Sequence, residues 1–121
     1  MGKKILLIED EEVIIRLLSR KLSGIGYEIA LAMDGQEGLD KMREQRPDLV
    51  LLDIIMPRKG GFEVLEEMRK DDRLFDIPVI IISNSGQPLE LERAKKLKVS
   101  DWLVKAEFDP KEVVEKIKKY I

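Results

Sequence analysis

The stretch RPDLVLLDIIMPRKGGFEVL, residues 46–65, contains the pattern that decides the fold. It includes DLVLLD (48–53), an uninterrupted apolar run between two aspartates, as is typical of a strand buried on both faces. After a loop that contains proline and glycine, apolar side chains recur at helical spacing, at Phe62, Leu65 and Met68. A buried strand that leads directly into an amphipathic helix is the repeating unit of a parallel α/β sheet.

Four more apolar runs precede helical patterns in the same way: KILLIE (4–9), YEIALA (27–32), PVIIIS (78–83) and WLV (102–104). The runs at 27–32 and 102–104 are mixed or short, so we expect them to be edge strands. Asp34 and Asp109 have the type and position of helix N-caps. Since crossovers between parallel strands are right-handed, five such units predict an α/β fold, a parallel five-stranded sheet with helices on both faces.

The composition limits the number of domains, the side chains available for catalysis and the kinds of partner that we expect. The 121 residues suit a single domain, 1–121, and 44% apolar residues are enough for one core. There is no cysteine and no histidine, which excludes disulfides and thiolate chemistry and removes the commonest general base. The net charge of -2 favours neither nucleic acid nor an anionic membrane as partner. Without an apolar span or a signal-peptide pattern, we expect a cytoplasmic protein.

Polar side chains stand where four of the predicted strands end. They are Glu9 and Asp10 after the first strand, Asp53 after the third, Ser83 after the fourth and Lys105 after the fifth. In an open α/β sheet, ligands bind beyond the carboxyl ends of the strands. If these strands are neighbours, three acids, a hydroxyl and an ammonium group share one rim.

Such a group of side chains suits phosphoryl transfer with Mg²⁺. Crowded carboxylates need a cation, and oxygen ligands favour Mg²⁺. A free carboxylate can serve as nucleophile, while lysine and serine can bind phosphoryl oxygens. A purely structural interpretation is open for each residue alone, since paired acids also cap helices and Asp53 could be a turn residue. The coincidence of all five on one rim favours a functional site.

At this point the sequence resembles the receiver domains of bacterial response regulators. The resemblance rests on residues 46–65, on LLIEDEE (6–12), on VIIIS before a helix and on DWLVKA (101–106), and it covers essentially the whole chain. It implies a flavodoxin-like (βα)5 three-layer sandwich with strand order 2-1-3-4-5. It also implies a phosphohistidine on a sensor kinase or phosphotransfer protein as phosphoryl donor. Signalling then uses the face of the fourth helix, fifth strand and fifth helix.

The resemblance assigns a role to each residue of the rim. Asp53 corresponds to the phosphorylated aspartate, Asp10 to the direct Mg²⁺ ligand and Glu9 to an acid that acts through water. The backbone carbonyl of Ile55 corresponds to the third protein ligand of the metal. Ser83 corresponds to the switch hydroxyl, and Lys105 to its partner on the phosphoryl group.

Several residues depart from the family pattern. Ala106 replaces the usual proline after Lys105, and we predict a cis Lys105–Ala106 bond. Trp102 replaces the usual switch tyrosine or phenylalanine, and its bulk is expected to restrict inward rotation. Lys98 replaces a common helix-ending glycine, so we expect a different C-cap geometry there. Apolar Ile55, which with Ser85 flanks the path of a hydrolytic water, predicts slow self-dephosphorylation.

Three other functions fit parts of this pattern. An aspartyl-phosphate phosphatase would need a second acid where Ile55 stands, and a flavin or nucleotide carrier would need a Gly- or Ser/Thr-rich loop where Glu9–Glu12 are acidic. A receiver-like binding module that no longer accepts phosphate is the third. We expect a signalling domain rather than an enzyme, able to form homodimers through the fourth-helix face. Kinase, target, pathway and any further domain stay open.

Overall fold

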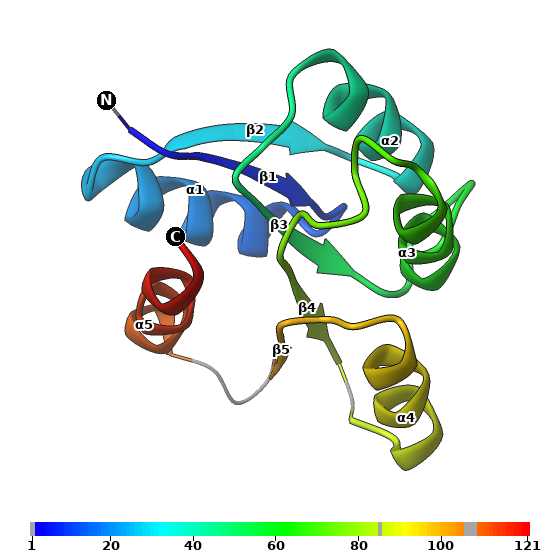
Figure 1. The fold of residues 1–121 in the computed structure, drawn as a ribbon. Helices are drawn as coiled ribbons and strands as arrows, with labels where there is room; N and C mark the ends of the chain where they lie inside the picture. The colour runs from blue at the N-terminus through cyan, green and yellow to red at the C-terminus, as the bar shows by residue number, and fades with distance from the viewer. Residues whose placement is uncertain (1, 85, 106–108) are drawn as a thin grey trace.

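Five strands and five helices alternate along the chain in a computed structural model, which describes residues 2–84, 86–105 and 109–121 (Figure 1). The strands are β1 (Lys4–Ile8), β2 (Glu28–Ala32), β3 (Leu49–Asp53), β4 (Val79–Ser83) and β5 (Asp101–Val104). The helices are α1 (Glu12–Gly24), α2 (Gly35–Glu44), α3 (Gly61–Lys70), α4 (Pro88–Lys96) and α5 (Pro110–Tyr120). Each predicted strand and each predicted helix is therefore present.

The strands form one parallel sheet in the order β2-β1-β3-β4-β5. Every residue of β3 and β4 is buried, and so is β1 after Lys4, because helices cover both of their faces. The edge strands β2 and β5 are only partly buried. The flavodoxin-like order and the two predicted edge strands are confirmed.

The core is divided by the sheet into two apolar layers. Leu18 and Leu22 of α1 pack with Val113 and Ile117 of α5 against one face. Helices α2, α3 and α4 cover the other face, through side chains that include Met42, Met68 and Ala94. Figure 1 shows the same division, with α1 and α5 on one side of the sheet and α2 and α3 on the other. The result is the predicted three-layer sandwich.

Helices α2 and α5 begin at the two predicted N-cap residues. Asp34 accepts a hydrogen bond from the backbone N–H of Glu37 (2.9 Å). Asp109 accepts one from the backbone N–H of Lys111 (2.8 Å), directly before Pro110. Each bond satisfies a donor that the first helical turn leaves unpaired.

The expectation of a different geometry at the end of α4 is wrong. Lys98 adopts the left-handed conformation (φ 59°) that glycine usually supplies at this position. The backbone N–H groups of Lys98 and Val99 donate to the carbonyls of Lys95 and Ala94 (3.1 and 3.2 Å). These two bonds form a Schellman motif, so Lys98 carries the strain that a glycine would avoid.

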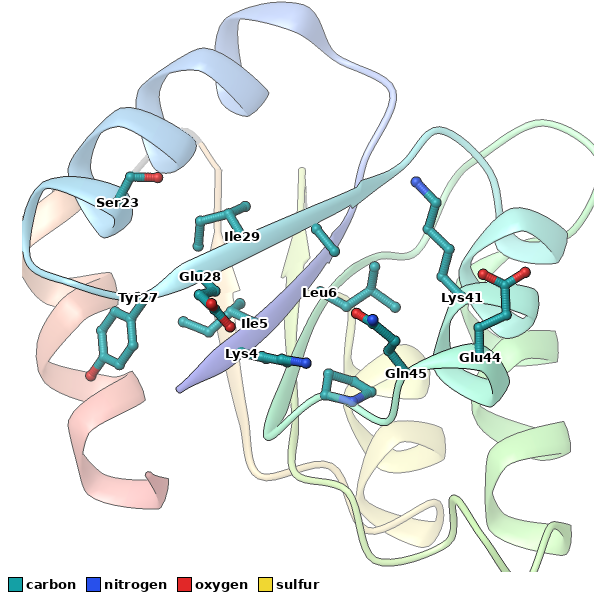
Figure 2. A pocket seen from close by; sticks show the side chains of 12 residues that line it. Lys4, Ile5, Leu6, Ser23, Tyr27, Glu28, Ile29, Lys41, Glu44 and Gln45 are labelled. Carbon is teal, nitrogen blue, oxygen red and sulfur yellow. The ribbon is translucent and has the colours of Figure 1, made fainter. Parts of the chain in front are cut away.

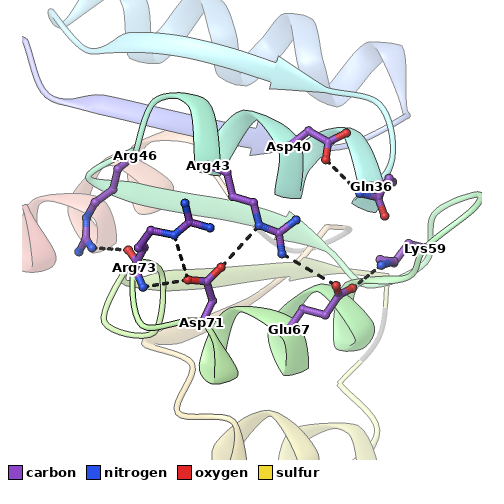
Figure 3. Close-up of polar contacts among 8 residues, drawn as sticks. All are labelled: Gln36, Asp40, Arg43, Arg46, Lys59, Glu67, Asp71 and Arg73. Atoms are coloured by element: carbon purple, nitrogen blue, oxygen red, sulfur yellow. Dashed lines mark hydrogen bonds and ion pairs between the residues drawn. The ribbon is translucent and has the colours of Figure 1, made fainter.

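Ion pairs join α2 to α3 on the surface, as Figure 3 shows. The guanidinium group of Arg43 lies 3.5 Å from Asp71 and 4.0 Å from Glu67, and Lys59 also pairs with Glu67. Each contributes little alone, but the shared partners make a network.

The outer edge of β2 is partly capped by side chains of α2. Lys41 donates to the carbonyl of Leu31, and the backbone N–H of Met33 donates to Glu37 (2.6 Å). A groove of about 900 Å³ runs along this strand, and Lys4, the first residue of β1, is among its lining residues. Figure 2 shows the side chains that line it. The groove thus reaches the amino end of the sheet, away from the predicted rim.

No helix in the described part of the chain is long and apolar enough to cross a membrane.

Candidate functional site at the carboxyl edge of the sheet

The register of the sheet brings the predicted rim residues together. Ile8 pairs with Leu52, so Glu9 follows β1 at the level of Asp53. Ser83, at the end of β4, pairs with Val104. The backbone N–H of Lys105 donates to the carbonyl of Ser83 (2.6 Å), which places Lys105 at the same edge.

Three carboxylates form the acidic centre of this edge. Glu9, Asp10 and Asp53 each offer one oxygen, and these oxygens lie within 4.8 Å of one another. Glu9 and Asp53 are almost fully buried (1% and 5% exposed), whereas Asp10 is exposed. The site therefore has buried walls and one side open to solvent.

The Lys105 ammonium group lies among the acids. Its Nζ atom is 2.9 Å from Glu9 Oε1, 2.8 Å from Glu11 Oε2 and 3.3 Å from Asp53 Oδ2. The Lys105 side chain is only 5% exposed. The ammonium is close enough to Asp53 to contact a group attached to that carboxylate.

Burial and charge change the pKa values of Asp53, Glu9 and Lys105 in the site. Burial raises the pKa of Asp53 above its ordinary value, although the charge of Lys105 opposes the change. Burial likewise raises the pKa of Glu9, and the charge of Asp53 adds to that increase. Burial alone would lower the pKa of Lys105, but its bonds to Glu11 and Glu9 and the charge of Asp53 raise it instead. Lys105 is therefore held in its charged form, whereas burial disfavours the charged forms of Glu9 and Asp53.

The residues fit a divalent cation. Glu9 Oε1 is buried and, within the described part of the chain, takes part in no hydrogen bond of acceptable geometry, although Lys105 is near. The other oxygen of Glu9 accepts from the backbone N–H groups of Asp10 and Glu11 (3.1 and 3.0 Å), which hold the carboxylate in place. A donor set of carboxylates without histidine or cysteine suits Mg²⁺.

The loop after β3 is held close to Asp53. The backbone N–H of Gly61 donates to the carbonyl of Ile54 (2.8 Å), so α3 begins directly against the end of the strand. The backbone N–H of Ile55 lies 3.4 Å from Asp53 Oδ1, and the Ile55 side chain is 72% exposed. An apolar side chain thus stands at the mouth of the site.

Two contacts near the site were not predicted. Glu11 was recognised only as part of an acidic run, and its ion pair with Lys105 joins residues 94 positions apart. Arg58, in the loop after β3, has a left-handed backbone (φ 65°) and donates to Asp34 at the start of α2 (Nε–Oδ2 2.9 Å). The backbone bond to Glu37 and this Arg58 contact hold the pKa of Asp34 below its ordinary value.

The remaining predicted residues have different outcomes. Ser83 is 3% exposed at the tip of β4. Trp102 is partly buried and packs against the apolar layer that α2, α3 and α4 cover. Ser85 and the predicted cis bond at Lys105–Ala106 lie outside the described residues.

The fold and the site together define a doubly wound α/β domain with a cluster of acids and a buried lysine at the carboxyl edge of its sheet. The chain belongs to the response regulator receiver domain family, whose model matches residues 5–118. Response regulators of this kind act in two-component signalling.

A curated relative is the probable transcriptional regulator ycf27 of Cyanophora paradoxa, which is 40% identical over 96% of this chain and 47% of the relative. The alkaline phosphatase synthesis transcriptional regulatory protein PhoP of Bacillus subtilis is 34% identical over 98% of this chain and 48% of its own length. The chain thus spans about half the length of the curated relatives it matches.

Similar solved structures have the same fold. The chemotaxis protein CheY4 of Vibrio cholerae matches with a TM-score of 0.92 and 27% identity, over 100% of both chains. The phosphorylated cyanobacterial phytochrome response regulator RcpA has a TM-score of 0.85 and 31% identity, and the Mn²⁺-bound form of response regulator Rcp1 has 0.83 and 28%. Each of these two covers 98% of this chain and 91% of its own.

Proposed function

We propose that this domain is a phospho-accepting switch in which Asp53 takes a phosphoryl group from a phosphohistidine of a sensor kinase or phosphotransfer protein. The observation that carries the proposal is the position of Asp53, buried among Glu9, Asp10 and Lys105, with the Lys105 Nζ atom 3.3 Å from its carboxylate. The phosphorylated form of the similar RcpA supports the same chemistry for this chain.

In the proposed step, a carboxylate oxygen of Asp53 attacks phosphorus. A new O–P bond forms while the P–N bond to the donor imidazole breaks, and the imidazole leaves with the bonding electrons. Lys105 neutralises charge on the phosphoryl oxygens, and the Ser83 hydroxyl donates a hydrogen bond to one of them. Positioning and charge neutralisation are sufficient for this kind of transfer.

The residues that would hold Mg²⁺ are Asp10, Asp53, Glu9 and the backbone carbonyl of Ile55. When bound, the ion offsets the charge of the acids and of the incoming phosphoryl group. The Mn²⁺-bound form of the similar Rcp1 and the cluster of three carboxylate oxygens support this assignment.

The proposed output is a change in the face formed by α4, β5 and α5. Only Ala94 of α4 is buried, and Leu89 and Leu91 are 80% and 41% exposed, so the helix carries an apolar surface and few core contacts. Such a surface suits a protein partner or a second copy of the domain. The domain would act as a signalling module that assists only its own phosphorylation and dephosphorylation, without turnover of a separate substrate.

Intact mass measurement after incubation with acetyl phosphate, with and without Mg²⁺, tests the proposal. We expect one added phosphoryl group that requires Mg²⁺ and is absent from Asp53→Asn. An unmodified wild-type protein, or an equally modified Asp53→Asn, would contradict it and favour a binding module without phosphoryl chemistry. Steady release of phosphate from a small phosphoester would instead favour a phosphatase.

The exposed Ile55 side chain supports slow loss of the phosphoryl group. It offers no hydrogen-bonding group to orient water beside Asp53. Replacing Ile55 with Asn, which can hold such a water, should shorten the phosphoryl lifetime. An unchanged lifetime would show that Ile55 does not control hydrolysis.

A further inference from the structure

The Lys105 ammonium carries three N–H donors, and three carboxylates surround it. Glu9 and Glu11 accept hydrogen bonds at 3.1 and 2.8 Å, and Asp53 lies at 3.3 Å. A phosphoryl oxygen that reaches Asp53 therefore meets an ammonium group whose donors are already engaged. One of the existing contacts has to be given up before Lys105 can bind the phosphoryl group.

The three carboxylates differ in how easily they release the ammonium. Glu9 is 1% exposed and is held by the backbone N–H groups of Asp10 and Glu11, so it is fixed in place. Asp53 is the residue that receives the phosphoryl group. The Glu11 side chain is 51% exposed, and water can solvate its carboxylate once the ion pair opens. Glu11 is thus the contact that costs least to break.

The start of α1 gives independent support. Glu11 is the N-cap residue of this helix, and its side chain makes no capping hydrogen bond. The carboxylate extends instead across the site to Lys105, which directly follows β5 and lies 94 residues later in the sequence. The local capping role, which is the usual use of a polar side chain at this position, is left unfilled.

From these contacts we infer that Glu11 is a positioning residue that restrains Lys105 before phosphorylation and thereby slows phosphoryl acceptance. An interaction present in the resting protein and lost in the transition state raises the barrier. This inference rests on the proposed function, since it concerns the rate at which Asp53 accepts the phosphoryl group.

Three variants distinguish the effect of losing the Glu11–Lys105 ion pair from a general effect of losing negative charge. Glu11→Gln removes the charge and the pair. Glu11→Asp keeps the charge, but its side chain is one methylene shorter and is suited to cap α1, so it leaves Lys105. Glu12→Gln is the matched control, because Glu12 is the next acid in the chain and pairs with Arg16 (2.7 Å) rather than Lys105.

The first measurement is the initial rate of phosphorylation by acetyl phosphate at saturating Mg²⁺. We expect Glu11→Gln and Glu11→Asp each to react about threefold to tenfold faster than wild type, the range that loss of one partly buried ion pair supports. Glu12→Gln should react at the wild-type rate. A wild-type rate in Glu11→Asp would overturn the inference, because charge alone would then explain any effect in Glu11→Gln. Unchanged or lower rates in both Glu11 variants would also overturn it.

The second measurement does not depend on phosphorylation. In ¹H–¹⁵N spectra of the lysine ammonium groups, the Lys105 signal should shift in Glu11→Gln and Glu11→Asp and stay in place in Glu12→Gln. An unshifted signal would overturn the inference. If the wild type takes up no phosphoryl group, the proposed function fails; if it does and the Glu11 variants match it, only the role of Glu11 fails.

Discussion

Gly61 approaches the backbone of Asp53 so closely that no side chain fits between them. A Cβ atom on Gly61 would lie 2.5 Å from the Asp53 carbonyl oxygen and 2.8 Å from the Cα atom of Ile54. The contact lets α3 begin directly against the end of β3, where its N-terminal backbone N–H donates to Ile54. Because the groups in contact are backbone atoms, they cannot move aside as a flexible side chain would.

Gly61→Ala should therefore destabilise the domain by about 2–3 kcal/mol and slow phosphorylation of Asp53, since the end of β3 has to shift to make room. Denaturant unfolding and the acetyl phosphate reaction measure the two effects. Gly24→Ala is the control, because a Cβ atom there meets nothing within 4 Å at the end of α1. We expect it to be neutral or stabilising by up to about 1 kcal/mol. Equal effects of the two alanines would contradict the close-approach argument.

Asp53→Asn should stabilise the domain at neutral pH. Burial raises the native pKa of Asp53 above its ordinary value of 3.8, so the native state holds its proton to higher pH than the unfolded chain does. Stability is then lost as pH rises from about the unfolded value through the native pKa. The amide removes this loss, and we expect a gain of about 1–2 kcal/mol at pH 7 that disappears near pH 3.

Unfolding at a series of pH values, with and without Mg²⁺, tests this expectation. Mg²⁺ should stabilise the wild type more than Asp53→Asn, because a ligand that binds only the native state adds to its stability. Asp72→Asn, at an exposed acid distant from the rim, should follow the wild-type pH profile. A variant at Asp53 that is less stable than wild type at pH 7 would show that the carboxylate is not under strain.

The sequence predicted the rim because strand ends are local features. Glu9, Asp53 and Ser83 each follow an apolar run, and parallel strands place such residues at one edge whatever the details of packing. The contacts of Glu11 and Arg58 could not be read in the same way. Both residues stand at ordinary local positions, a helix start and a loop, but the partners of their side chains come from distant segments.

The left-handed backbone at Lys98 shows a different limit of prediction from the sequence. Side-chain type suggested a different helix end, but the closing bonds from Lys98 and Val99 outweigh the strain of one residue. Lys98→Gly should relieve that strain and stabilise the domain by about 0.5–1 kcal/mol. Lys95→Gly, inside the same helix and exposed, should destabilise by about 1 kcal/mol. Thermal unfolding distinguishes the two, and destabilisation by both glycines would contradict the strain argument.

Arg69 links three segments through backbone carbonyls. Its guanidinium donates to Phe75 and Ile77 in the loop before β4 and to Leu97 and Lys98 after α4, at 2.7–3.2 Å. Since α4 buries only Ala94, these polar bonds are a large part of what attaches its C-terminal end to α3.

Arg69→Met keeps much of the apolar stem and removes every donor, so it should cost about 3 kcal/mol of unfolding free energy, the scale for losing hydrogen bonds from a charged group to buried acceptors. Lys70→Met, at the exposed neighbouring position, should change stability by less than about 0.5 kcal/mol. Hydrogen exchange should become faster at the amides of Lys98 and Val99 in Arg69→Met alone, because their bonds close the end of α4. Arg69→Lys should recover little, since one ammonium group cannot span four carbonyls. Equal protection of these amides in the two methionine variants would mean that α4 is held at its C-terminal end by its apolar contacts instead.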